Sequence, residues 1–153
     1  MKRLDSLLRR PAPGKTPAAN VPPTTALHEA LEAAQRAKRA EQYPQALDAL
    51  NRAQTLAASD ATSLAVITVS QAEIYILQER WADAEAVLNR ARQVAYDASQ
   101  RTHLAYVLDM QGVLALAQGK VEPARQLHEQ ALETARGVRA IGAEGRALGH
   151  LGD

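Results

Sequence analysis

The amino-acid sequence predicts an all-α, right-handed solenoid built from helical hairpins. Three observations lead to this prediction: a phrase that recurs about every forty residues, apolar residues at helical spacing around it, and turn signals between the segments. One helical pair cannot bury its apolar face alone, so neighbouring pairs must stack, and stacking leaves an extended groove. The recurring phrase is Tyr43-x-x-Ala46-x-x-x-Leu50-x-x-Ala53, Trp81-x-x-Ala84-x-x-x-Leu88-x-x-Ala91 and Val121-x-x-Ala124-x-x-x-His128-x-x-Ala131.

The chain begins with a basic, proline-rich segment. Residues 1–15 carry five basic side chains against one acidic side chain, so the rest of the chain has a net charge of −3 although the total is +1. Five of the seven prolines lie between Pro11 and Pro23, and proline blocks helical hydrogen bonds. We expect residues 1–23 to be a disordered tail and residues 24–153 to form the repeat domain.

The repeat domain divides into three hairpins and a partial one. In each hairpin the recurring phrase lies in the second helix, helix B, and helix A precedes it. Pro44 and Pro123 fall in the first turn of a B helix, where the missing N–H is not needed. Capping residues are expected at Thr24 or Thr25 and at Ser59 or Asp60, and the third A helix is expected over Leu104 to Gln118. The expected repeats are 24–58, 59–97, 98–137 and the partial repeat 138–153.

The last stretch is rich in glycine, at Gly137, Gly142, Gly145, Gly149 and Gly152. Each interior glycine weakens a lone helix by roughly 1 kcal/mol relative to alanine, so packing must compensate. We expect a fourth A helix whose small residues allow close approach to the third pair. Two alignments of this stretch with the third repeat are open: one pairs Gly152 with Gly112, and the other pairs Gly145 with Gly112. The first is preferred because it keeps Leu-Gly aligned with the family phrase.

The preferred alignment leaves an apolar helix face uncovered, which suggests self-association, a capping partner or a longer parent protein.

The recurring phrases resemble tetratricopeptide repeats. Ala72-x-x-Tyr75 is similar to the small-x-x-Tyr signature of helix A, and the aromatic-x-x-Ala of helix B stands at Tyr43 and Ala46 and again at Trp81. The resemblance covers roughly residues 25 to 153. The alanines of the B helices are 38 and then 40 residues apart, longer than the standard repeat of about 34, which indicates the long-repeat branch.

The segment from Gly142 to Asp153 resembles the Leu-Gly-Asn repeat proteins and bacterial regulators with similar repeats. This resemblance implies that Arg146, the arginine of Gly-Arg-Ala, faces the concave groove and holds an extended partner segment. The residue before Leu-Gly has the same implied role. Here His150 stands where asparagine is usual, and Asp153 replaces the asparagine after Leu-Gly.

Catalytic and metal-binding motifs are not recognisable in the sequence, which predicts no catalytic residue, no metal ligand and no cofactor. Cysteine is absent, which excludes disulfides and thiol nucleophiles. Pro13-Gly14-Lys15-Thr16 resembles the end of a phosphate-binding loop, but Arg9 stands where its first glycine belongs. None of the histidines has a histidine partner one turn away, so they are interpreted as surface or packing residues, with His128 partly buried. These histidines are His28, His103, His128 and His150.

The sequence therefore predicts a non-enzymatic protein-interaction module or scaffold, cytoplasmic and bacterial, that binds a peptide segment of a partner in a groove formed by the A helices. Two alternatives stay open: the regulatory portion of a bacterial transcription or signalling regulator, and a homo-oligomeric element that pairs through the C-terminal half-repeat. Membrane association is not expected, and nucleic-acid binding by the basic tail would be weak and salt-sensitive. The candidate groove contacts are Glu73, Tyr106, Asp109, Arg146 and His150.

Overall fold

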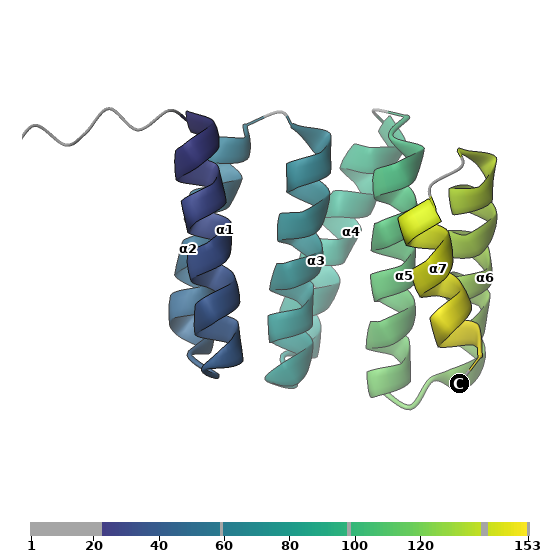
Figure 1. The fold of residues 1–153 in the computed structure, drawn as a ribbon. Coiled ribbons are helices and arrows are strands. Elements are labelled where there is room, and N and C mark those ends of the chain that lie inside the picture. Colours follow the sequence, from purple (N-terminus) through teal and green to yellow (C-terminus); the bar gives the residue numbers. More distant parts are fainter. Residues whose placement is uncertain (1–22, 59, 98, 139–140, 153) are drawn as a thin grey trace, which may run out of the picture.

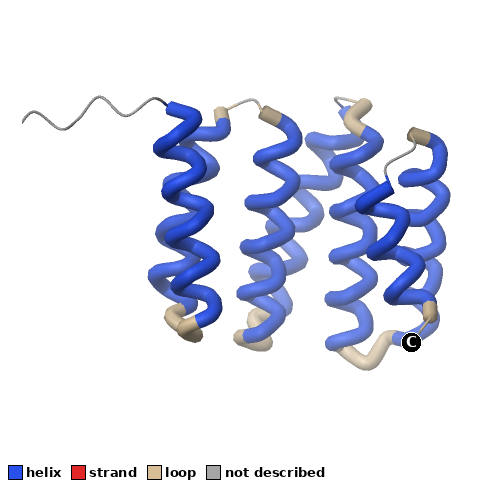
Figure 2. The backbone as a smooth tube through the Cα atoms, viewed as in Figure 1, coloured by secondary structure: helices blue, strands red, loops and turns tan. Residues whose placement is uncertain are grey.

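A computed structural model describes residues 23–58, 60–97, 99–138 and 141–152 of the chain. In these ranges it contains seven α-helices and no strand (Figures 1 and 2), which confirms the predicted all-α solenoid. The helices are α1 (Pro23–Arg39), α2 (Tyr43–Ala57), α3 (Ala61–Leu77), α4 (Trp81–Asp97), α5 (Arg101–Ala117), α6 (Val121–Gly137) and α7 (Ile141–Leu151).

The helices form two layers (Figure 1). The A helices α1, α3, α5 and α7 lie in the nearer layer of this view, and the B helices α2, α4 and α6 lie behind them. Helices α1, α3 and α5 each pack on the B helix that follows them, α7 packs on α6, and α5 also contacts α3 on one side and α7 on the other. In the described part of the chain, no helix combines the length and the apolar character needed to cross a membrane.

The recurring phrase supplies the contacts between the layers. Its first alanine, at Ala46, Ala84 and Ala124, is fully buried in all three copies. Because alanine is small, the helix backbones approach closely, and the stack depends on many modest contacts. The next position is buried in each copy as well, as Leu50, Leu88 and His128. The opening position varies: Tyr43 and Trp81 are half-buried, whereas Val121 is exposed.

The turns between A and B helices repeat one hydrogen-bonding pattern. Glu41, Glu79 and Gly119 have left-handed φ angles of 57°, 55° and 75°. In each turn the next N–H donates to the carbonyl five residues earlier, as in Lys120 to Ala115 at 2.8 Å. This is the Schellman motif, which satisfies the last carbonyls of the A helix. The three hairpins therefore reverse direction in the same way.

Some predicted boundaries were wrong by a few residues. Asp60 is the N-cap of α3 as predicted, and its side chain accepts a hydrogen bond from the Ser63 N–H at 3.1 Å. However, α1 begins at Pro23, so Thr24 and its neighbour lie inside the helix instead of capping it. Helix α5 begins at Arg101, before the predicted Leu104. The predicted tail lies outside the described residues, except for Pro23.

The fourth A helix is present as α7. It begins at Ile141, forty residues after the first residue of α5, which favours the register that aligns Gly152 with Gly112. Helix α7 packs on the third hairpin through Ala143 and Ala147, which are 1% and 0% exposed. The expectation that its glycines make close contacts was wrong for Gly145 and Gly149, because a Cβ atom there would meet open space. Buried alanines therefore compensate for the weak helix propensity.

Candidate functional site

The four A helices line one hollow of about 540 Å³, here called the A-face groove. Apolar side chains of α3 form its floor: Val66 is 49% exposed, whereas Ala65 and Val69 are buried. Charged and aromatic side chains from the other A helices lie at its edges. The lining residues are Gln35 and Lys38 of α1, Ala65, Val66, Val69, Ser70 and Glu73 of α3, Tyr106 of α5, and Gly142 and Arg146 of α7.

Two charged contacts flank the floor. At one edge the Lys38 ammonium of α1 forms an ion pair with the Glu73 carboxylate of α3, and both side chains are only partly exposed. At the other edge the Arg146 guanidinium lies over the Tyr106 ring, 5.6 Å from its centroid. The Nε atom of Arg146 is 3.3 Å from Oδ2 of Asp109, so this ion pair does not use the terminal amino groups.

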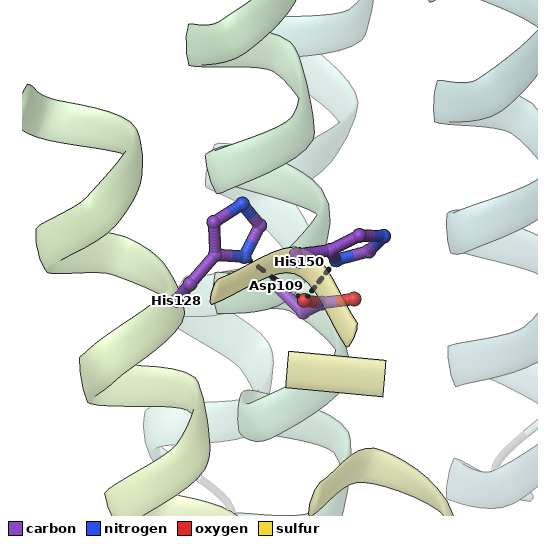
Figure 3. Close-up of side chains that lie close together, drawn as sticks. All are labelled: Asp109, His128 and His150. Carbon is purple, nitrogen blue, oxygen red and sulfur yellow. Dashed lines mark hydrogen bonds and ion pairs between the residues drawn. The ribbon is translucent and has the colours of Figure 1, made fainter. Parts of the chain in front are cut away.

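Four polar side chains, here called the Asp109 cluster, meet beside the groove: Asp109 and His128, which are buried, and His150 and Arg146, which are partly exposed. Asp109 of α5 is 1% exposed. Its Oδ1 atom accepts hydrogen bonds from Nδ1 of His128 at 3.0 Å and from Nδ1 of His150 at 2.8 Å (Figure 3). Because an ionised carboxylate only accepts, both Nδ1 atoms carry the proton. The cluster therefore joins α5, α6 and α7 at one oxygen atom.

The ring of His128 is fixed by packing as well as by hydrogen bonding. It is 1% exposed, so the prediction that it is only partly buried was wrong. Burial lowers the pKa of His128, and the hydrogen bond to Asp109 opposes this effect in part. A Cβ atom on Gly112 would lie 2.5 Å from Cε1 of His128, so the ring occupies the space that a side chain on α5 would need. Gly112 is thus required by the histidine, not by its own backbone conformation.

The structure brings four of the five predicted contacts together and leaves one apart. Tyr106, Asp109, Arg146 and His150 meet where α5 and α7 cross, whereas Glu73 lies across the groove on α3. Asp109 was predicted as a candidate groove contact; its carboxylate is buried, and its oxygens face His128, His150 and Arg146. His150 turns toward Asp109 and does not line the A-face groove.

Sequence reasoning missed Lys38, Val66 and the partnership of His128 with Asp109. One signal for the partnership was available. His128 occupies the position where the other two copies of the phrase have Leu50 and Leu88. A polar side chain at a core position needs a buried hydrogen-bond partner, and Asp109 lies one turn before Gly112 on the facing helix.

A second buried histidine, His103 of α5, lines two further hollows of about 300 Å³ and 450 Å³. It is 5% exposed, and neither ring nitrogen has a hydrogen-bond partner among the described residues. Burial lowers its pKa. Because this imidazole binds a proton less readily in the folded protein than in the unfolded chain, it makes the free energy of unfolding depend on pH.

Residues 63–137 match the family model of the tetratricopeptide repeat. The match begins within α3 and ends with the last residue of α6, so it contains the second and third copies of the recurring phrase. No curated protein and no solved structure matched the chain. The match supports the predicted tetratricopeptide repeats in this part of the chain; it does not reach α1, α2 or α7.

Replacing Gly112 with alanine should destabilise the protein despite the better helix propensity of alanine. Overpacking costs about 1–3 kcal/mol, and a contact of 2.5 Å with the buried His128 ring places this site in the upper part of that range, above the gain of about 1 kcal/mol expected for glycine to alanine in a helix. Gly145→Ala on α7 is the matched control, because its Cβ meets open space and only the gain remains. Urea unfolding measures both; equal stabilisation by the two alanines would contradict the packing assigned to His128.

The free energy of unfolding should fall as the pH is lowered below about 6.5, the ordinary pKa of histidine. His103 and His128 have lowered pKa values in the folded protein, so the unfolded chain binds more protons in this range and the stability present above it is lost. His103→Leu should reduce the slope of stability against pH between 7.5 and 5.5, measured by urea unfolding. The exposed His28→Leu is the control. An unchanged slope in His103→Leu would contradict the contribution assigned to that residue.

Proposed function

We propose that the chain is a non-enzymatic interaction module whose A-face groove binds an extended segment of a partner protein. Tetratricopeptide repeats generally mediate protein–protein interactions, and residues 63–137 match that family. The observation that carries the proposal is that one hollow receives side chains from all four A helices. A ligand that contacts every repeat must be elongated, and a peptide segment meets that requirement.

The floor and the edges of the groove suggest what such a segment contains. Val66 is 49% exposed at the floor, and an apolar partner side chain would bury it. Arg146 lies on α7, which is separated from α3 by α5, and its terminal amino groups take no part in the ion pair to Asp109. Guanidinium groups bind carboxylates well through paired hydrogen bonds. The partner segment should therefore carry an acidic group near an apolar side chain.

Arg146 is already oriented before a partner binds. Asp109 holds its Nε atom and Tyr106 supports the face of the guanidinium, so less side-chain freedom is lost on binding. The resemblance of residues 142–153 to Leu-Gly-Asn repeats also supports this assignment, because it implies a groove role for the same arginine. His150 would act indirectly, by holding α7 in place through Asp109.

The proposal can be tested with peptides selected from a random library on the immobilised chain and measured by fluorescence anisotropy. Arg146→Gln should weaken binding about tenfold, equivalent to about 1.4 kcal/mol, by removing the carboxylate contact. Val66→Glu should weaken it comparably, because it places a charge on the apolar floor without touching the Asp109 cluster. Arg125→Gln is the matched control, since Arg125 lies on the B-helix layer and pairs only locally with Glu122.

Thermal unfolding of each variant separates a loss of binding from a loss of folding. Selected peptides that bind the wild-type chain, Arg146→Gln and Val66→Glu equally well would place the interaction outside the A-face groove and overturn the proposal. A selection that yields no peptide with measurable affinity would overturn it too.

A further inference from the structure

We infer that Asp109, His128 and His150 form a binding site for a divalent transition-metal ion, with Zn²⁺ as the best-suited ion. The site is distinct from the A-face groove and lies where α5, α6 and α7 meet (Figure 3). One ligand atom from each residue lies within 4.8 Å of the other two.

The donor set fits a transition metal better than a lighter ion. It consists of two imidazole nitrogens and one carboxylate oxygen, which is a set that Zn²⁺ accepts in tetrahedral geometry with a fourth position for water. Mg²⁺ and Ca²⁺ prefer oxygen ligands and larger coordination numbers. His150 is partly exposed, with 33% of its side-chain surface accessible, so an ion and its water can reach the site from that side.

The distances show how the two imidazole rings have to rearrange to bind an ion. The two Nδ1 atoms are 3.0 Å and 2.8 Å from Oδ1 of Asp109, and the rings are tilted by 47° with centroids 4.8 Å apart. Metal bonds of about 2.0–2.2 Å in a tetrahedron place ligand atoms about 3.3–3.5 Å apart. Each imidazole therefore has to move away from the carboxylate oxygen by roughly 0.5 Å, and the ligand nitrogens of the two rings, which lie within 4.8 Å of each other, have to reach the same spacing by rotation of the side chains.

Metal binding also has to remove the protons that now lie between Nδ1 and Oδ1. Each neutral imidazole can move its proton to Nε2 and present the Nδ1 lone pair to the ion. This change of tautomer replaces the two hydrogen bonds to Oδ1 with metal bonds, and it places an N–H on Nε2 of His128, which has no hydrogen-bond partner among the described residues. The imidazoles stay neutral and the carboxylate stays ionised, so the total number of bound protons is unchanged.

Arg146 sets the electrostatic limit on affinity. Its Nε atom is 3.3 Å from Oδ2, so the arginine occupies one carboxylate oxygen and leaves Oδ1 for the ion. The guanidinium repels a second cation at this distance, and with three protein ligands we expect dissociation constants of roughly micromolar size. Because this repulsion weakens metal binding, removing the positive charge of Arg146 should tighten it.

The test is calorimetric titration of the full, chelator-stripped chain with Zn²⁺, together with Co²⁺ titration followed by its visible absorption. The expected result is one ion per chain, with an absorption spectrum of a tetrahedral site. His150→Gln should weaken binding at least tenfold, and Arg146→Gln should strengthen it several-fold. His28→Gln is the matched control, because His28 lies beside Glu32 on the surface of α1 and would account for adventitious binding.

Circular dichroism establishes that each variant is folded, and a ¹⁵N spectrum of the histidine rings of the wild-type chain reports ligation without any substitution. Zn²⁺ should shift the resonances of His128 and His150 and leave those of His103 in place. Absence of Zn²⁺ and Co²⁺ binding by the wild-type chain, or binding that His28→Gln abolishes and His150→Gln does not, would overturn the site. Arg146→Gln is expected to weaken peptide binding but to tighten metal binding. The failure of one proposal can therefore be told apart from the failure of the other.

Discussion

The burial of one carboxylate, that of Asp109, governs the arrangement of the last three helices. A buried ionised group is costly unless hydrogen bonds and opposite charge replace its water. Asp109 is 1% exposed, and its partners come from α6 and α7, not from its own helix. Oδ1 accepts both histidine hydrogen bonds, whereas Oδ2 has no hydrogen bond among the described residues and faces the charge of Arg146, so the docking of α6 and α7 determines how the carboxylate is compensated. Apolar contacts hold the repeats together, but alanines are nearly interchangeable in their packing, whereas the Asp109 contacts specify one register.

The same carboxylate links the interior of the hairpin with the A-face groove. Its Oδ1 atom faces the two histidines, and its Oδ2 atom faces Arg146 at the groove edge. In the proposed function Arg146 contacts the partner, and in the inferred metal site the histidines hold the ion. The two events would share Asp109, so occupation of one site should alter the electrostatic environment of the other.

Much of the fold could be predicted from the sequence because the repeat constrains it at every level. Ala46, Ala84 and Ala124 are recognisable by spacing alone, and all are fully buried. The groove residues were predicted less well. Periodicity assigns Asp109 to an A helix, but the face it shares with His128 depends on how α5 and α6 cross, which no local pattern encodes. Lys38 and Glu73 are 35 residues apart in the chain, and their pairing likewise arises only when α1 and α3 stack.

The most direct measurement of the central claim is amide hydrogen exchange of the wild-type chain and of Asp109→Asn, which keeps the side-chain shape but removes the charge. If the carboxylate holds α7 on the third hairpin, amides of residues 144–151 should exchange much faster in the variant, while those of α1 to α4 keep their protection. Unchanged protection of α7 in a folded Asp109→Asn protein would contradict the account, because the alanine contacts alone would then be sufficient to dock the helix.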